Sequence, residues 1–196
     1  ILETENRGDV ISVIKHAEKW KVAKKQEEFD TKQYFMYLKN LMTEARELLG
    51  SDRATLFLRD GDELWAKIID GLNPIRVPIG RGIVGSSAET LKMINIPDAY
   101  KDDRFNSAID KKSGYHTQSI LCVPVINPNT QELVGVMQCI NKLHGTFNDD
   151  DIDMLKEYCA YIYDKSLRKD VHMEKIYQLQ SSVNEWKRQR KTKATN

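Results

Sequence analysis

The 196-residue sequence is poor in the features that mark several large protein classes. Its three scattered cysteines, Cys122, Cys139 and Cys159, do not suit a disulfide framework and favour a reducing compartment such as the cytoplasm. Its most apolar stretch, around Ile120 to Pro124, is far shorter than the roughly 20 residues of a membrane helix. The N-terminus lacks the basic start and apolar core of a signal peptide. We therefore expect a cytoplasmic protein with no membrane span.

Net charge and clustered histidines are lacking as well. The 30 Lys and Arg residues nearly balance the 29 Asp and Glu residues, which argues against a nucleic-acid-binding protein, since such a protein needs a basic excess. No histidine stands in a metal-ligand motif with an acidic residue: the four are His16, His116, His144 and His172. The sequence has no GxSxG nucleophile motif, and no phosphate-binding lysine follows its glycine-rich turn. We expect no metal, no cofactor and no catalytic residue.

Helical periodicity dominates the N-terminal part of the chain. Apolar residues three or four positions apart predict an exposed connecting helix over residues 1–29. A second helix is expected from Asp30, which can cap it, to Gly50, which tolerates a left-handed backbone. The apolar stripe of this second helix is predicted to be Tyr34, Leu38, Leu41, Ala45 and Leu48.

The pattern then changes to short segments typical of β-strands. Residues 53–60 and 61–70 predict a hairpin with an Asp-Gly turn. A third strand is expected at residues 75–79, at an edge or a strand end, because Pro78 cannot donate to a neighbouring strand. Two segments rich in β-branched and aliphatic residues are predicted as central strands, residues 119–126 and 133–143.

A last helix is expected after Asn148, which can cap it, with acidic residues 149–151 at its positive end. Its apolar positions fall on one register of alternating spacings of three and four: Ile152, Leu155, Cys159, Ile162, Met173, Ile176 and Val183, with Ser166, Lys169 and Gln180 at the intervening positions. This helix either pairs with a second copy in a homodimer or simply covers the sheet.

The expected elements define a fold class and three parts of the chain. The order of helices and hairpins predicts an α+β fold, an antiparallel sheet with helices packed on one face. The parts are a connecting helix at 1–29, a domain at 30–164, and a connecting helix with a basic tail at 165–196.

Three glycines, Gly80, Gly82 and Gly85, match GxGxxG between a strand and a segment of helical composition from Ser86 to Leu91. A dinucleotide-binding fold would continue as repeated βαβ units, and this sequence does not. Two interpretations stay open. The glycines make a tight turn, or they free amides at a helix start that bind an anion such as a phosphate.

A polar segment at residues 98–118 has no regular period, and a loop of this length inside a domain is usually functional. Short polar and aromatic side chains occur along it: Phe105, Asp110, Ser113, Tyr115 and Thr117. Such side chains can bind ribose hydroxyls and base edges while an aromatic ring covers the base. The segment is therefore either a lid over the helix start or an ordinary solvated loop.

Several stretches together resemble a GAF domain of the cyclic-nucleotide-binding kind. They are ATLFLRD, IRVPIGRGIVG, NIPDAYKDDRFN, DKKSGYHTQSILCVPV and LVGVMQCINK followed by FNDDD, within about residues 30–164. Such domains regulate cyclic-nucleotide phosphodiesterases and certain bacterial adenylyl cyclases. The NKFDE signature of the family corresponds to Asn141, Lys142, Phe147 and Asp151. Ile152 stands where the final Glu is usual, and the signature implies structural roles rather than ligand contacts.

The resemblance also implies ligand contacts. They fall on Thr55, Ile69, Asp70, Ile83, Val84, Asn106, Asp110, Ser113, Thr117 and Gln138. The backbone amides of Ile83 and Val84 would hold the cyclic phosphate, and the polar side chains would bind purine and ribose. Gln138 both donates and accepts hydrogen bonds, so the resemblance favours cAMP slightly over cGMP.

The function implied by the resemblance is regulatory rather than enzymatic. A cyclic nucleotide binds, the lid closes, and the C-terminal helix carries the change to an effector. The effector would be a phosphodiesterase or cyclase catalytic domain in the same longer chain. The alternative is a ligand-free GAF module that serves only as a dimerisation scaffold, and only the ligand site distinguishes the two.

Overall fold

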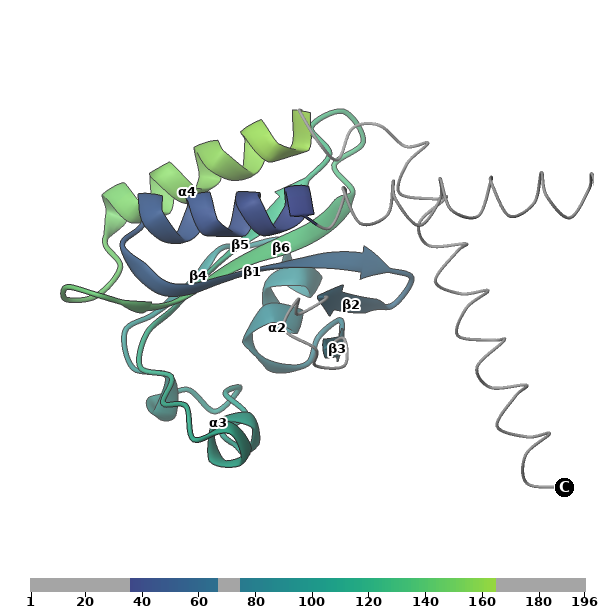
Figure 1. Cartoon of the computed structure of the whole chain (residues 1–196). Coiled ribbons are helices and arrows are strands. Elements are labelled where there is room, and N and C mark those ends of the chain that lie inside the picture. Colours follow the sequence, from purple (N-terminus) through teal and green to yellow (C-terminus); the bar gives the residue numbers. More distant parts are fainter. Residues whose placement is uncertain (1–35, 67–74, 165–196) are drawn as a thin grey trace, which may run out of the picture. The chain divides into compact units, whose positions relative to one another are not determined.

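The computed structural model describes residues 36–66 and 75–164 (Figure 1). By backbone contacts the chain forms two units, Ile1–Leu38 and Lys39–Asn196, and nearly all described residues belong to the second. The predicted helix at 1–29, the predicted start at Asp30 and the predicted C-terminal helix and tail from residue 165 lie outside the described residues. Within the described residues, no helix has the length and apolar character needed to cross a bilayer.

One antiparallel sheet of six strands forms the centre of the domain, in the order β3-β2-β1-β6-β5-β4. The strands are β1 Ser51–Asp60, β2 Glu63–Ala66, β3 Ile75–Pro78, β4 Ile94–Ile96, β5 Ile120–Ile126 and β6 Leu133–Lys142. The β1–β2 hairpin and the central position of β5 and β6 confirm the sequence predictions. Strand β3 is an edge strand that ends at Pro78, also as predicted. The short strand β4 was not predicted.

Pro124 is tolerated within β5 because β4, the strand on one side of β5, is short. Pro124 pairs with Val136 of β6. On the other side, β4 pairs only with Ile120, Leu121 and Cys122. The missing amide hydrogen of Pro124 therefore faces no neighbouring strand.

Two helices cover one face of the sheet: α4 (Asp149–Ile162) and the helix that includes residues 39–48 (Figure 1). The Tyr158 hydroxyl of α4 donates to the Leu41 carbonyl at 2.8 Å, which joins the two helices. The predicted stripe needs one correction, because Leu48 is 49% exposed and Leu49 is 1% exposed. Leu49 follows the buried Ala45 by four residues and so stays on the stripe, whereas Leu48 falls at its edge.

The start of α4 agrees with the prediction. The Asn148 side chain accepts from the Asp151 amide, and the Asp151 carboxylate accepts from the Asn148 amide. This reciprocal capping box fixes where the helix begins, and three acidic residues occupy its first turn.

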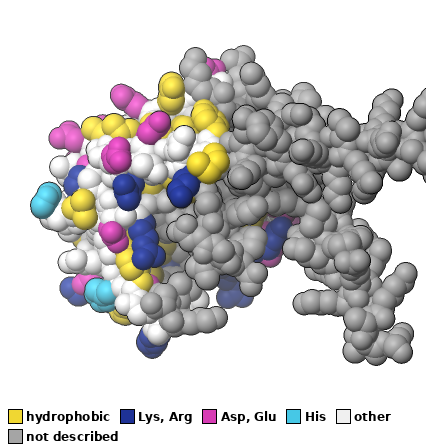
Figure 2. All heavy atoms as spheres, in the orientation of Figure 1, with side chains coloured by type: hydrophobic (Ala, Val, Ile, Leu, Met, Phe, Trp, Pro, Cys, Tyr) yellow, Lys and Arg dark blue, Asp and Glu magenta, His cyan; other side chains and the backbone are white. Residues whose placement is uncertain are grey.

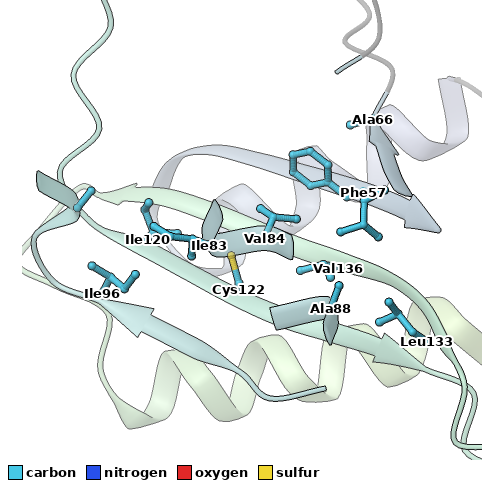
Figure 3. Packing of buried hydrophobic residues seen from close by; sticks show 12 residues of the cluster. Phe57, Ala66, Ile83, Val84, Ala88, Ile96, Ile120, Cys122, Leu133 and Val136 are labelled. Carbon is cyan, nitrogen blue, oxygen red and sulfur yellow. The ribbon is translucent and has the colours of Figure 1, made fainter. Parts of the chain in front are cut away.

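The opposite face of the sheet carries α2 (Gly82–Thr90), whose apolar side chains join a core cluster on β1, β5 and β6 (Figure 3). The segment expected to be an irregular loop contains η1 (Ala99–Lys101) and α3 (Ala108–Ser113). Two residues of this segment that the sequence pattern did not identify as apolar contacts attach it to the core. Ala99 belongs to the core cluster, and Phe105 packs against that cluster. The α+β antiparallel class is confirmed. The two longer helices share one face, and α2 lies on the other.

Candidate functional site

The start of α2 is built by glycines whose backbone excludes other residues. Gly80 and Gly82 have φ angles of 83° and 65°, which favour glycine. A Cβ on Gly85 would lie 2.5 Å from the Pro78 carbonyl oxygen, so a side chain there would collide with β3. The helix begins at Gly82, four residues earlier than the predicted Ser86. The tight-turn interpretation of these glycines therefore holds.

The same geometry leaves amides at the start of the helix for a ligand. Gly82, Ile83 and Val84 occupy the first turn, where α-helix geometry supplies no carbonyl partner for the amides. Arg81 is the N-cap residue and makes no side-chain cap hydrogen bond, and the first turn contains no acidic residue. The side chains of Ile83 and Val84 are buried in the core cluster, so only their backbone can face a ligand. This arrangement suits an anion.

Polar side chains follow one row across the sheet on the face that carries α2. Thr55 of β1 pairs with Gln138 of β6, and Gln138 pairs with Cys122 of β5. Cys122 belongs to the same core cluster as Ile83 and Val84 (Figure 3), whereas Thr55 and Gln138 are half-buried. The structure therefore brings together two predicted contacts, Thr55 and Gln138, on the face where α2 begins.

Segment 99–118 reaches the start of α2. The Arg104 carbonyl oxygen lies 3.8 Å from the position that a Cβ of Gly82 would take. Arg104 pairs with Asp102 through its Nε at 2.9 Å and its Nη2 at 2.7 Å. This pairing raises the pKa of Arg104 and lowers that of Asp102. The segment thus adjoins the helix start, as a lid would.

Asp110 and Thr117 bind each other. The buried Asp110 carboxylate accepts from the Thr117 amide at 2.6 Å and from the Thr117 hydroxyl at 2.9 Å. The Tyr100 hydroxyl also donates to it at 3.1 Å. Partial desolvation, followed by this contact with Asp110, raises the pKa of Tyr100, whose side chain is otherwise exposed. In this arrangement the two predicted contacts stabilise the segment internally.

Two other side chains of the segment have local structural contacts. The Asn106 side-chain oxygen accepts from the Ala108 amide at 3.0 Å, at the start of α3. The Tyr115 hydroxyl donates to Asp52, and Arg53 lies over the Tyr115 ring at 3.7 Å. Burial is the main cause that raises the pKa of Tyr115. Tyr115 is therefore fixed against β1 rather than free to cover a base.

The NKFDE residues connect the segment, the sheet and α4. Asn141 has a φ of 58°, and its side-chain oxygen accepts from the Gln118 amide at 2.6 Å. Lys142 donates to Asp151 at 2.6 Å and to the Leu49 carbonyl at 2.7 Å. Phe147 is buried, and its ring lies 5.9 Å from the Lys142 ammonium nitrogen. These contacts hold the end of β6 against α4.

Two thiols are buried, and the described part of the chain contains no cluster of metal-ligating side chains. Burial raises the pKa of Cys122 and of Cys139 to about 12, so both thiols are neutral and unreactive near neutral pH. Among the described residues, no group of three or more His, Cys, Asp or Glu side chains could hold a metal ion. Acidic and basic side chains are interspersed on the face shown in Figure 2.

Some predicted contacts cannot be placed, and one polar partner was missed. Ile69 and Asp70 lie outside the described residues, as does the side chain of Ser113, whose backbone ends α3. Sequence reasoning assigned Cys122 to core packing, which its burial confirms, but did not connect it with Gln138. Only the register of β5 against β6 places these two residues side by side.

Known proteins are similar to this chain in sequence. The model of the GAF domain family matches residues 37–162. The "Probable 3',5'-cyclic phosphodiesterase pde-5" of Caenorhabditis elegans is 34% identical over 155 residues, covering 66% of this chain and 21% of the relative. The "cGMP-specific 3',5'-cyclic phosphodiesterase" of Drosophila melanogaster is 38% identical over 134 residues, covering 58% of this chain and 12% of the relative. The chain spans about a fifth or less of these relatives.

Solved structures share the fold at low sequence identity. The GAF domain of a phosphoenolpyruvate-protein phosphotransferase from Coxiella burnetii has a TM-score of 0.57 at 21% identity, covering 66% of this chain and 79% of that chain. The corresponding Acinetobacter domain has a TM-score of 0.52 at 21% identity, covering 64% and 76%. Free methionine-R-sulfoxide reductase from Neisseria meningitidis has a TM-score of 0.51 at 20% identity, covering 64% and 73%. These similarities establish the fold alone.

Proposed function

The chain belongs to the GAF domain family, and we propose that it is a regulatory domain that binds a cyclic nucleotide. One observation carries the proposal. The first-turn amides of α2, which suit an anion, lie on the same sheet face as the half-buried polar pair Thr55 and Gln138. An anionic phosphate joined to a polar base and ribose matches this combination of donors and acceptors.

In the proposed complex, the amides of Ile83 and Val84 hold the cyclic phosphate. An anion at such a helix start gains about 0.3 to 2 kcal/mol. Thr55 and Gln138 bind base or ribose from the sheet. The remaining contacts come from the hairpin and from the lid, and they rest on the family resemblance: Ile69, Asp70, Asn106, Asp110, Ser113 and Thr117.

Gln138 decides the base in this proposal. A freely turning amide both donates and accepts, and on that ground the sequence slightly favours cAMP. The contact between Gln138 and Cys122 bears directly on this choice.

The relatives support a regulatory role within a longer protein. Two of them are named as cyclic phosphodiesterases, and this chain matches only a small part of each. We therefore place the catalytic activity in another domain of the parent chain, a phosphodiesterase or a cyclase, and none in this domain. Occupancy would reach that domain through the C-terminal helix. Dimerisation through the terminal helices and a cytoplasmic location belong to the same proposal.

A ligand-free dimerisation scaffold is the second candidate. It is favoured by the mutual contacts of Asp110 and Thr117, which satisfy each other without a ligand.

A thermal-shift assay with cAMP and with cGMP separates the two candidates. Ligand at a hundred times its dissociation constant adds about 2.7 kcal/mol to the free energy of unfolding. For a domain of this size the melting temperature then rises by several degrees. No shift with either nucleotide at millimolar concentration would favour the scaffold.

A further inference from the structure

A fully buried thiol contacts the side chain proposed to read the base. Gln138 Nε2 lies 3.5 Å from Cys122 Sγ, a hydrogen-bond distance for a sulfur acceptor. Cys122 is 0% exposed, while Gln138 is half-buried, and the two residues are direct partners across β5 and β6. The amide nitrogen of Gln138 is therefore turned toward Cys122. Figure 3 shows Cys122 within the core cluster.

The state of the thiol supports this orientation. Burial raises the pKa of Cys122 to about 12, so its sulfur is a neutral acceptor throughout the physiological pH range. Cys122 is surrounded by apolar members of its cluster, including Val84, Ile120 and Val136. A side-chain N–H that approaches such a surface needs an acceptor, because a buried unpaired donor is costly. The sulfur of Cys122 supplies that acceptor.

We infer that Cys122 is a positioning residue that sets the base preference of the domain by holding the Gln138 amide with its acceptor oxygen toward the ligand. This inference rests on the proposed function, since it deepens the role given there to Gln138. The inference also changes the slight preference for cAMP over cGMP that the sequence suggested. An amide held in this way acts on the base chiefly as an acceptor.

The two purines differ in what they offer to a fixed acceptor. Paired recognition of adenine by glutamine uses both atoms of the amide, the oxygen for N6 and the nitrogen for N7. The nitrogen of Gln138 is directed at Cys122 instead. Adenine can still donate its N6 amino group to the oxygen of the restrained amide, but the contact between the amide nitrogen and N7 is lost. Guanine needs only an acceptor, because its N1–H and its N2 amino group are neighbouring donors that one oxygen can accept from. The restraint on the amide therefore shifts the base preference from cAMP toward cGMP.

The test is the ratio of the dissociation constants for cAMP and cGMP, measured by calorimetry in the wild type and in Cys122→Ala. Loss of the sulfur frees the amide to rotate, so the ratio should move toward cAMP by about 2- to 10-fold, the range of one hydrogen bond. Cys122→Ser keeps an acceptor and should preserve the wild-type ratio within about twofold. Cys139→Ala is the matched control, since Cys139 is equally buried on the other face of the same sheet.

A double variant distinguishes an effect of Cys122 on the orientation of Gln138 from general damage to the fold. In a Gln138→Ala background, Cys122→Ala should leave the ratio unchanged, because the amide that it orients is absent. An unchanged ratio in the single variant, a shift toward cGMP, or an equal shift in the Cys139→Ala control would overturn the inference.

A measurement without ligand keeps the inference distinct from the proposed function. In glutamine-labelled protein, the side-chain NH₂ resonances of Gln138 should shift in Cys122→Ala and stay unchanged in Cys139→Ala. If the wild type binds neither nucleotide, the proposed function fails. The NMR comparison then still shows whether Cys122 holds the amide, and unchanged resonances in Cys122→Ala overturn the inference.

Discussion

One face of the sheet, which we call the covered face, is covered by α4 and residues 39–48. The other face carries α2 and segment 99–118. On the first face, Leu121, Met137 and Cys139 are fully buried. On the second face, which we call the open face, Thr55 and Gln138 are only half-buried, although Gln138 lies between Met137 and Cys139 on the same strand. Both faces carry a buried core, and the second face also keeps two polar side chains partly accessible beside its core cluster. The difference teaches that one sheet can be packed on both sides and still offer polar groups to a ligand on one of them.

The largest effect is expected where α4 is tied to the sheet on the covered side. Lys142→Ala leaves Asp151, whose side chain is 9% exposed, without its ion-pair partner at 2.6 Å. Breaking a buried pair in this way should lower the free energy of unfolding by about 3–5 kcal/mol. Urea denaturation measures the loss. Lys156→Ala removes an exposed ion pair with Asp153 and should lower the free energy of unfolding far less. Equal losses in the two variants would contradict the conclusion that the pair of Lys142 and Asp151 holds α4 to the sheet.

A core truncation on the covered face should change stability without changing binding. Leu155 is 0% exposed on α4, and Leu155→Ala should cost about 2–5 kcal/mol of unfolding free energy through the cavity it leaves. Its neighbour Met154 is 41% exposed, so Met154→Ala serves as the control. Nucleotide affinity, measured well below the melting temperature, should stay at the wild-type value. A large loss of affinity would show that the two faces are not separable.

The converse is expected on the open face. Gln138→Ala should weaken nucleotide binding by about 1–3 kcal/mol, because a polar group of the ligand loses its partner. Since Gln138 is only half-buried, its truncation should change the unfolding free energy much less than Leu155→Ala. Calorimetry and denaturation on the same preparation give both quantities. Unchanged affinity would mean that Gln138 is not a ligand contact.

The smallest effect concerns the two thiols that lie on opposite faces. The pKa of each is raised to about 12, so unfolded thiols ionise from about pH 8.5 while the folded ones stay neutral. The contribution of each thiol to the free energy of unfolding is therefore fully present well below pH 8.5 and is lost as the pH rises above it. Between pH 8 and 9 the loss is about 0.7 kcal/mol per thiol.

Cys122→Ala and Cys139→Ala should each remove an equal part of this pH dependence, as measured by denaturation in reducing buffer. A smaller contribution from Cys122 would show that water reaches the core cluster from the open face.

The sequence was sufficient where local chemistry decides the structure. The turn at Gly61, the cap at Asn148 and the apolar residues of β5 and β6 are local signals, and each predicted its element. Segment 99–118 was less predictable, because its anchors Ala99 and Phe105 meet the core only after the sheet has formed.

The candidate site likewise contains some contacts that the sequence could predict and others that it could not. Thr55 and Gln138 could be named from the resemblance, and strand register places them side by side. The mutual binding of Asp110 and Thr117 depends on how α3 folds back on residues 115–117. The contact of Cys122 with Gln138 depends on long-range pairing that no local pattern encodes.

Calorimetric titration of the wild-type chain with cGMP and with cAMP tests the central claim most directly, namely that the open face binds a cyclic nucleotide. The account predicts saturable binding of both nucleotides at one site per chain, with the smaller dissociation constant for cGMP. The absence of saturable heat from either nucleotide at millimolar concentration would contradict it.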